Sequence, residues 1–270
     1  MNTYGMHSIH GRAPAFATGI KLANPELSVW LVTGDGDGLS IGGNHLAHIL
    51  RRNVDVKILL FNNEIYGLTK GQYSPTSKIG LKTKTSPMGS VDRPFNPVAF
   101  ALGCGATFVA RTIDTHLKHM EATLLAAAAH KGSALVEIYQ NCVIFNDGTF
   151  DAVADKTVRD DKTIDLEPEK PMLYGKARDR GLKVEGFDVR MVPAANADTW
   201  RADTPSAGPA FVMSQLDSDP TMPRPIGLFR RVTAPVFNDG VNAQVRDAIA
   251  KKGPGKLRDL FYTGDMWDVR

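Results

Sequence analysis

The sequence predicts an α/β protein in which a parallel sheet is covered by helices on both faces, followed by a polar, proline-rich C-terminal segment. Two observations predict it: strand-like apolar runs alternate with helical stretches over residues 1–150, and no such alternation continues over residues 151–270. A chain of 270 residues is long enough to bury a substantial core. We therefore expect a folded domain at 1–150 and a segment at 151–270 that serves subunit packing.

Four runs in the first part predict strands: residues 28–33, 54–61, 106–111 and 134–139. Each is short and almost continuously apolar, which is typical of strands buried on both faces. Residues 42–52, 97–102 and 115–129 between them predict helices, and Asp114 or Thr115 is a candidate N-cap of the last one. Ligands of such sheets bind at the carboxyl ends of the strands, so the loops after Thr33 and Phe61 are the expected functional loops.

The second part differs from the first in composition. Residues 151–270 carry 38 charged side chains against 23 in residues 1–150, and ten of the sixteen prolines follow residue 167. All seven histidines and both cysteines lie before residue 143. Since these compositions favour short elements and polar surface, we expect the chemistry to lie in the first part.

Composition also excludes several classes of function. Two cysteines cannot form a disulfide framework or supply a four-cysteine metal site alone. With 32 basic and 29 acidic side chains, the charge balance does not predict a nucleic-acid partner. The sequence has neither an apolar run long enough for a membrane span nor the pattern of a signal peptide. A cytoplasmic protein without membrane contact is the expectation.

The loop after the first predicted strand reads GDGDGLSIGGN over residues 34–44. Its five glycines let backbone amides approach an anion, and Asp35 and Asp37 offer the oxygen ligands that magnesium prefers. An ordinary turn and a calcium loop of the EF-hand type are the alternatives. No Glu stands at the distance that an EF-hand loop requires, so the calcium loop is not favoured.

The loop after the second predicted strand reads NNEIYGLTKGQ over residues 62–72. If the two strands are parallel neighbours, Asn63 lies beside Asp35 at one edge of the sheet. One carboxylate, one amide oxygen and one backbone carbonyl would leave the other positions of an octahedral ion to diphosphate and water.

Together, Gly34-Asp35-Gly36 and Asn62-Asn63 resemble the magnesium and diphosphate signature of thiamine diphosphate enzymes. The surrounding sequence resembles the β subunits of the 2-oxoacid:ferredoxin oxidoreductases, and within them the 2-oxoglutarate branch. The similarity extends over residues 1–150 and continues more weakly through KPMLYGK and PRPIGLFR. It implies a thiamine diphosphate-binding fold.

The resemblance implies a role for each residue of the motifs. Asp35 and Asn63 would bind Mg²⁺ by their side chains and Ile65 by its backbone carbonyl. Contacts with thiamine diphosphate, including its thiazolium end, would come from His10, Gly11, Gly36, Asp37, Gly67 and Leu68. His10 is the candidate catalytic residue, with a capping or hydrogen-bonded structural histidine as the alternative.

The implied activity is oxidative decarboxylation of a 2-oxoacid, with 2-oxoglutarate favoured by the branch that the sequence resembles. The acyl group would pass to coenzyme A and the electrons to ferredoxin, and an α subunit would complete the enzyme. In this family the acid that activates the aminopyrimidine ring comes from the other subunit, so Glu64 is not assigned that role. Arg12 and Lys70 are candidates by position for a second substrate carboxylate.

Cys142 matches the fourth cysteine that holds a [4Fe-4S] cluster in the family, whereas Cys104 matches no ligand position and is expected in the core. The other three cluster cysteines precede the point that corresponds to Met1, so we expect a truncated reading of a longer gene rather than a cluster-less variant. Two other functions remain open: a simple thiamine diphosphate-dependent decarboxylase or carboligase subunit, and a non-catalytic assembly subunit with an incomplete cluster.

Overall fold

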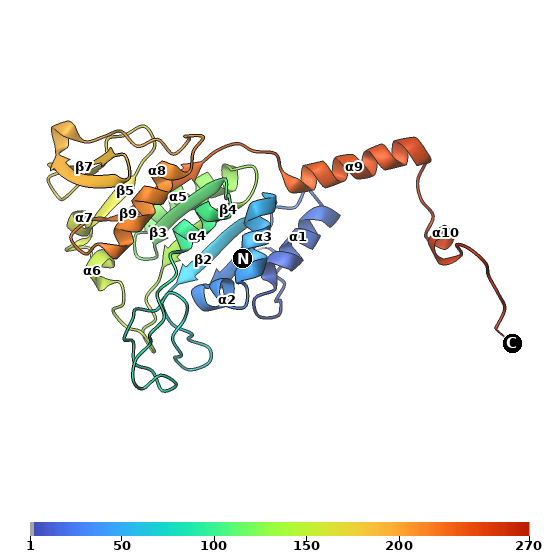
Figure 1. Ribbon diagram of the computed structural model, residues 1–270, viewed down its shortest axis with the longest axis horizontal. Coiled ribbons are helices and arrows are strands. Elements are labelled where there is room, and N and C mark those ends of the chain that lie inside the picture. Colours follow the sequence, from blue (N-terminus) through green and yellow to red (C-terminus); the bar gives the residue numbers. More distant parts are fainter. Residues whose placement is uncertain (1–2, 270) are drawn as a thin grey trace.

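A computed structural model describes residues 3–269, and its central feature is a six-stranded sheet (Figure 1). Four strands are mutually parallel, as the alternation of elements predicted. The last two strands, β9 and β5, are parallel to each other and antiparallel to these four. In spatial order the sheet contains β1 (Trp30–Gly34), β2 (Lys57–Asn62), β4 (Ala134–Tyr139), β3 (Phe108–Ile113), β9 (Arg224–Arg231) and β5 (Thr163–Leu166).

Helices cover both faces of this sheet. One layer consists of α1 (Ala13–Ala23), α3 (Gly43–Arg52), α4 (Pro97–Gly103) and α8 (Gly208–Ser214), in which neighbouring helices pack on one another. The chain moves from β3 back to β4 through α5 (Leu117–Ala129), in the direction opposite to the earlier crossovers. Because such crossovers are right-handed, α5 lies on the opposite face. The predicted fold class is confirmed.

The predicted elements are present, with boundaries shifted by a few residues. The fourth strand agrees fully, whereas the first three begin two or three residues later than predicted. The fifth helix begins at Leu117 with His116 at its N-cap, so the predicted cap at Asp114 or Thr115 is wrong. The reason is a turn: the His116 amide donates to the Ile113 carbonyl at 3.0 Å, and the two residues between them form that turn.

Residues 151–270 contribute more regular structure than their composition predicted. Strand β9 has eight residues and pairs with β3, so the central sheet includes chain from beyond residue 150. A separate antiparallel sheet contains β6 (Leu173–Tyr174), β7 (Arg180–Glu185) and β8 (Asp188–Pro193). The short helices of this part are α6 (Asp151–Ala154), α7 (Arg159–Lys162), η1 (Ala194–Asn196) and η2 (Gln215–Ser218). Whether residue 150 is a domain boundary stays a prediction.

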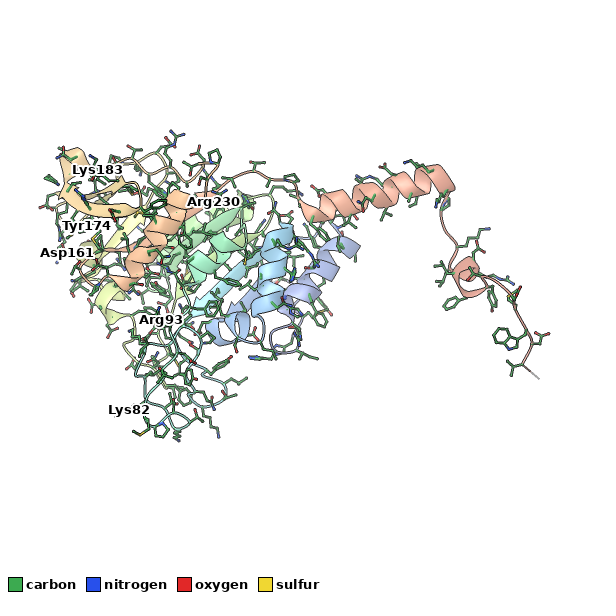
Figure 2. The ribbon with its side chains drawn as sticks, viewed as in Figure 1. Lys82, Arg93, Asp161, Tyr174, Lys183 and Arg230 are labelled. Atoms are coloured by element: carbon green, nitrogen blue, oxygen red, sulfur yellow. The ribbon has the colours of Figure 1, made fainter. Side chains whose placement is uncertain are left out.

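Two segments extend from the body. The connection between β2 and α4 is long and almost without regular structure, and Lys82 lies at its far end (Figure 2). At the other side, α9 (Phe237–Lys252) and α10 (Leu257–Phe261) project away from the sheet (Figure 1). We call residues 237–269 the C-terminal arm.

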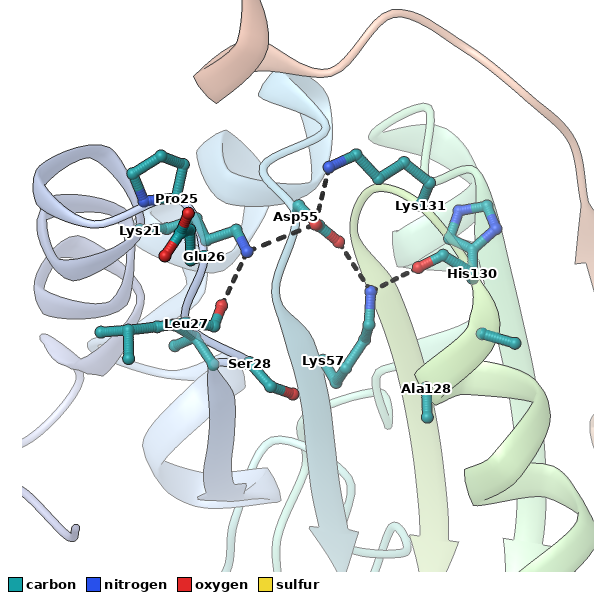
Figure 3. Close-up of a pocket in the computed structure, with 12 residues that line it drawn as sticks. Lys21, Pro25, Glu26, Leu27, Ser28, Asp55, Lys57, Ala128, His130 and Lys131 are labelled. Carbon is teal, nitrogen blue, oxygen red and sulfur yellow. Dashed lines mark hydrogen bonds and ion pairs between the residues drawn. The ribbon is translucent and has the colours of Figure 1, made fainter. Parts of the chain in front are cut away.

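A cluster of charged residues ties the amino ends of the strands together. Lys21, Lys57 and Lys131 converge on Asp55 at 3.4, 2.8 and 3.3 Å (Figure 3). The Lys57 ammonium group also donates to the carbonyls of His130 and Gly132, so all of its protons have acceptors. A cavity of about 310 Å³ lies beside the cluster. Because the lysines are already paired, this cluster holds α1, β2 and β4 in place at the edge opposite to the functional loops.

Candidate functional site

The predicted meeting of the two loops is confirmed. β1 and β2 are parallel neighbours with Gly34 opposite Phe61, so Asp35 and Asn62 both stand at the carboxyl end of the sheet. Asp35 begins the short helix α2 (Asp35–Leu39), where the sequence predicted a loop. The backbone N–H of Asn63 faces Asp35 Oδ1 at 3.5 Å, so the two predicted metal ligands lie side by side.

Asp35 is a buried carboxylate with hydroxyl and amide neighbours. It is 1% exposed, and its Oδ2 accepts a hydrogen bond from Thr76 Oγ1 at 2.6 Å. Burial raises the pKa of the Asp35 carboxyl, and hydrogen bonds from Ser74 and Thr76 partly oppose this. No cationic side chain of residues 3–269 is among the groups that lower this pKa. A buried carboxylate with no such partner is a suitable place for a cation.

The geometry around Asn63 fits magnesium. One terminal atom of its side-chain amide lies 3.2 Å from Asp35 Oδ1 and 2.8 Å from the Ile65 carbonyl oxygen. A nitrogen at this place would donate to both oxygens, whereas an oxygen at this place, which also accepts the Ile65 amide N–H at 3.3 Å, would stand beside two further oxygens as a candidate ligand of a cation. Neighbouring ligands of an octahedral Mg²⁺ lie about 3 Å apart, since each stands about 2.1 Å from the ion. The two distances from the Asn63 side chain therefore agree with the spacing of neighbouring magnesium ligands.

Tyr66 explains why Gly36 is a glycine. The Tyr66 hydroxyl donates to the Gly36 carbonyl at 2.7 Å, and its ring lies against the Gly36 backbone. A Cβ at Gly36 would stand 2.4 Å from Tyr66 Cε1, which no side chain tolerates. The loop after β2 thus fixes the first turn of α2, and the predicted contact of Gly36 with the cofactor stays a prediction.

Asp37 binds the N-terminal segment to the end of β1. Its Oδ1 accepts the Gly11 amide at 2.6 Å and lies 2.8 Å from His10 Nδ1, and its Oδ2 accepts from Thr33 Oγ1 at 2.5 Å. The His10 side chain is 52% exposed beside this anchor. The structure therefore brings His10, Gly11 and Asp37 together next to Asp35, and their contacts with cofactor stay predictions.

Gly67, Leu68 and Cys142 meet on the outer side of the second loop. Leu68 is 96% exposed, which is unusual for a leucine and leaves its side chain available to a ligand or partner. A Cβ on Gly67 would lie 3.9 Å from Cys142 Sγ, so this thiol stands beside the predicted cofactor loop. Cys104 instead packs against the core, as expected, and both cysteines are free thiols.

Glu64 has a structural explanation. It has φ of +56°, an uncommon backbone conformation for a residue with a side chain. Its buried carboxylate accepts from Thr149 Oγ1 at 2.6 Å and pairs with Lys78 at 3.4 Å. Burial raises the pKa of the Glu64 carboxyl, and Thr149 and Lys78 oppose this. These contacts hold the turn that presents Asn63 and Ile65.

The two residues proposed for a second substrate carboxylate are separated. Lys70 lines a cavity of about 450 Å³ next to Ile65. The other residues of this cavity are Gly71, Leu81, Lys82, Thr83, Lys84, Ile144 and Phe145. The Arg12 guanidinium lies instead at 3.4 Å from the His45 ring. Of the two, Lys70 is therefore the one that lines a cavity together with Ile65, a predicted metal ligand.

Sequence reasoning missed the hydroxyl groups that surround Asp35 and Glu64. Ser74, Thr76 and Ser77 are buried; Thr76 donates to Asp35, and Ser77 Oγ donates to the Glu64 carbonyl at 2.5 Å. They come from the segment YSPTS at 73–77, which returns to the sheet edge from the long connection. Three serine and threonine residues in five positions were the available signal, but nothing in the sequence indicates which group they bind.

Residues 3–269 contain no cluster of three or more His, Cys, Asp and Glu side chains suited to a metal ion, so the predicted ligand set at Asp35 would depend on amide and carbonyl oxygens. None of their helices has the length and apolar character that crossing a bilayer requires.

Comparison with known proteins decides the family. Residues 1–138 match the family model described as thiamine pyrophosphate enzyme, C-terminal TPP binding domain. Over its full length the chain is 47% identical to 2-oxoglutarate oxidoreductase subunit KorB of Mycobacterium tuberculosis, of which it covers 74%. Over 54% of its length it is 50% identical to 2-oxoacid:ferredoxin oxidoreductase 1, subunit beta, of Aeropyrum pernix, of which it covers 46%. The chain belongs to the β subunits of the 2-oxoacid:ferredoxin oxidoreductases.

A solved structure supports the same family of oxidoreductases. The 2-oxoglutarate:ferredoxin oxidoreductase from Magnetococcus marinus, described with 2-oxoglutarate, coenzyme A and succinyl-CoA bound, is 30% identical. Its fold matches with a TM-score of 0.73 over 96% of this chain and 75% of that one. The family, the fold class and the class of enzyme predicted from the sequence are confirmed, and these relatives do not favour the decarboxylase or assembly alternatives. The roles of the individual site residues stay predictions.

Proposed function

We propose that this chain is the β subunit of an enzyme that oxidatively decarboxylates 2-oxoglutarate, forming the acyl-CoA and passing two electrons to ferredoxin. Similarity to KorB over the whole chain and to the Magnetococcus enzyme supports the substrate. The observation that carries the proposal is the meeting of Asp35 Oδ1, the Ile65 carbonyl oxygen and the end of the Asn63 side-chain amide at the sheet edge. An α subunit completes the enzyme.

The residues of this chain have defined tasks in that reaction. Asp35, Asn63 and the Ile65 carbonyl would hold Mg²⁺, which would supply positive charge to the diphosphate of thiamine diphosphate. The bound cofactor supplies the ring that accepts the electron pair when carbon dioxide leaves the 2-oxoacid. Asp37 keeps His10 and Gly11 beside it, and Lys70 offers a cation to the distal carboxylate of 2-oxoglutarate.

The cysteines of this sequence do not complete the iron–sulfur cluster of the family. A [4Fe-4S] cluster takes four thiolates, whereas this sequence has two cysteines and only Cys142 stands beside the cofactor loop. The residues described here do not by themselves fit the cluster. We assign Cys142 as the one candidate ligand.

The test uses the full chain purified together with its α subunit. We expect reduction of viologen or ferredoxin that depends on coenzyme A and is faster with 2-oxoglutarate than with pyruvate. Asp35→Ala should abolish Mg²⁺-dependent binding of thiamine diphosphate, whereas Asp188→Ala, an exposed carboxylate in β8, should leave it unchanged. Unaltered affinity of the Asp35 variant for thiamine diphosphate would contradict the proposed metal site. Faster turnover of pyruvate than of 2-oxoglutarate would contradict the proposed substrate.

A further inference from the structure

The two oxygens of Asp35 have different surroundings. Oδ1 faces the backbone N–H of Asn63 and the end of the Asn63 side-chain amide. The same end of that amide lies near the Ile65 carbonyl, where the proposed Mg²⁺ would bind. Oδ2 points the other way and accepts the Thr76 hydroxyl at 2.6 Å. The carboxylate therefore has one oxygen for the metal and one oxygen held by the protein.

Thr76 is well placed to hold that second oxygen. It is 4% exposed, and a hydroxyl bond to a carboxylate is shorter and stronger than one between neutral groups. Its Oγ1 also lies 3.0 Å from Asn62 Oδ1 and 3.2 Å from Ser74 Oγ. Because a hydroxyl has one proton, the charged oxygen of Asp35 is the acceptor that competes best for it.

Asn62 connects this contact to the centre of the sheet. Its side-chain nitrogen donates to Glu137 Oε1 at 2.8 Å, and the other oxygen of Glu137 accepts from Arg111 Nε at 2.7 Å. The side chains of Arg111 and Glu137 are fully buried. Buried hydrogen bonds thus run from Asn62 across β2 and β4 to β3, and Asn62 Oδ1 lies beside the Thr76 hydroxyl. Groups connected in this way have little freedom to rotate.

We propose that Thr76 is a positioning residue for the metal-binding carboxylate: its hydroxyl fixes the rotation of Asp35 so that Oδ1 faces Mg²⁺. The inference rests on the proposed function, since it concerns the same metal site. Partners of metal ligands orient them, and their loss commonly weakens metal affinity by about 10- to 100-fold. Thr76 reaches the site from the long connection after β2, which links the ordering of that connection to metal binding.

The experiment measures metal affinity rather than turnover. The full chain with its α subunit and saturating thiamine diphosphate is titrated with Mn²⁺ in place of Mg²⁺, and free Mn²⁺ is followed by electron paramagnetic resonance. Thr76→Val keeps the shape but removes the hydroxyl, so we expect affinity to fall by about 10- to 100-fold. Thr76→Ser keeps the hydroxyl and should stay within about 3-fold of the wild type, since the donor to Asp35 remains.

Controls separate positioning from folding. Thr123→Val removes a buried hydroxyl that donates only within α5, to the His119 carbonyl, and should leave Mn²⁺ affinity unchanged. Thermal unfolding without metal verifies that each variant is folded. If Thr76→Val does not fold, Thr76→Ala is titrated with Mn²⁺ in its place.

The outcomes are distinguishable. Equal affinity in wild type and Thr76→Val, or an equal loss in the valine and serine variants, overturns the role of the hydroxyl while the proposed function stands. If the wild type shows no metal-dependent binding of thiamine diphosphate, the proposed function fails and this inference fails with it.

Discussion

Individual buried side chains of this chain are tuned by their surroundings, and His130 shows this away from the proposed site. Its Nε2 lies 2.8 Å from Thr107 Oγ1, and its ring packs on Phe108 with centroids 5.3 Å apart. Burial, and then the nearby charge of Lys57, lowers the pKa of His130 from 6.5 to about 4. The folded protein therefore keeps this imidazole neutral where an unfolded chain would protonate it.

This shift predicts a pH dependence of stability. Between pH 6.5 and pH 4 the unfolded state binds a proton that the folded state does not, so stability falls as the pH decreases through this window. His130→Gln retains a partner for Thr107 but does not titrate, so it should lose less stability between these pH values than the wild type. Urea unfolding at several pH values measures the difference, and parallel curves for the two proteins would contradict the assignment.

Among the elements, β3 contacts the chain beyond residue 150 through its pairing with β9 and also through one arginine. Arg111 donates to Glu137 of β4 and makes two bonds to Asp217 of η2, at 2.8 and 2.6 Å. Burial acts to lower the pKa of the Arg111 guanidinium, but the charges of Asp217 and Glu137 outweigh it and raise this already high pKa. The rings of Tyr139 and Phe229 lie within 5.0 and 5.4 Å of it. A buried cation with two carboxylates thus connects β3, β4 and η2.

Asp217→Ala should destabilise the protein by about 3 kcal/mol, at the low end of the range for breaking a buried pair because Glu137 still pairs with Arg111. Chemical unfolding measures the loss. Asp203→Ala removes an exposed carboxylate that pairs with Arg201 and serves as the control. A loss of less than about 1 kcal/mol of unfolding free energy in Asp217→Ala would be no more than an exposed ion pair contributes. That result would show that the Arg111–Asp217 pair adds little to stability.

At the scale of the whole molecule, the C-terminal arm is separate from the packed body. Its first residues are attached: the Asn238 side chain accepts the Asp55 amide at 3.0 Å, and Asn238 is fully buried. Beyond them α10 has no buried residue. The exposed apolar side chains of the arm are Val245, Ile249, Leu257, Leu260, Phe261, Tyr262, Met266, Trp267 and Val269.

Removing residues 253–270 should therefore leave thermal stability unchanged within about 2 °C, since every residue described in 253–269 is exposed. Removing residues 237–270 deletes the buried Asn238 as well and should lower the unfolding midpoint. Differential scanning calorimetry compares the two deletions. An equal decrease in both would place a stabilising contact in α10.

The sequence by itself determined the parallel sheet and the meeting of its two functional loops. The apolar runs at 28–33 and 54–61 predict two strands, and parallel strands bring their carboxyl ends to one edge of a sheet. Asp35 and Asn63 were therefore predictable as neighbours on the condition that these two strands pair, and the structure shows that pairing. The family was predictable too, since the motifs of both loops occur together.

Only the tertiary structure decided which groups surround those ligands. Thr76 is far from Asp35 in sequence, as Glu137 and Arg111 are from Asn62, and no local pattern indicates that these groups meet. The same holds for β9, which joins the sheet beside β3 although the composition of residues 151–270 favoured short polar elements. The physical reason is that helix and strand patterns depend on nearby residues, whereas buried hydrogen bonds and sheet order depend on how distant segments satisfy one another's polar groups.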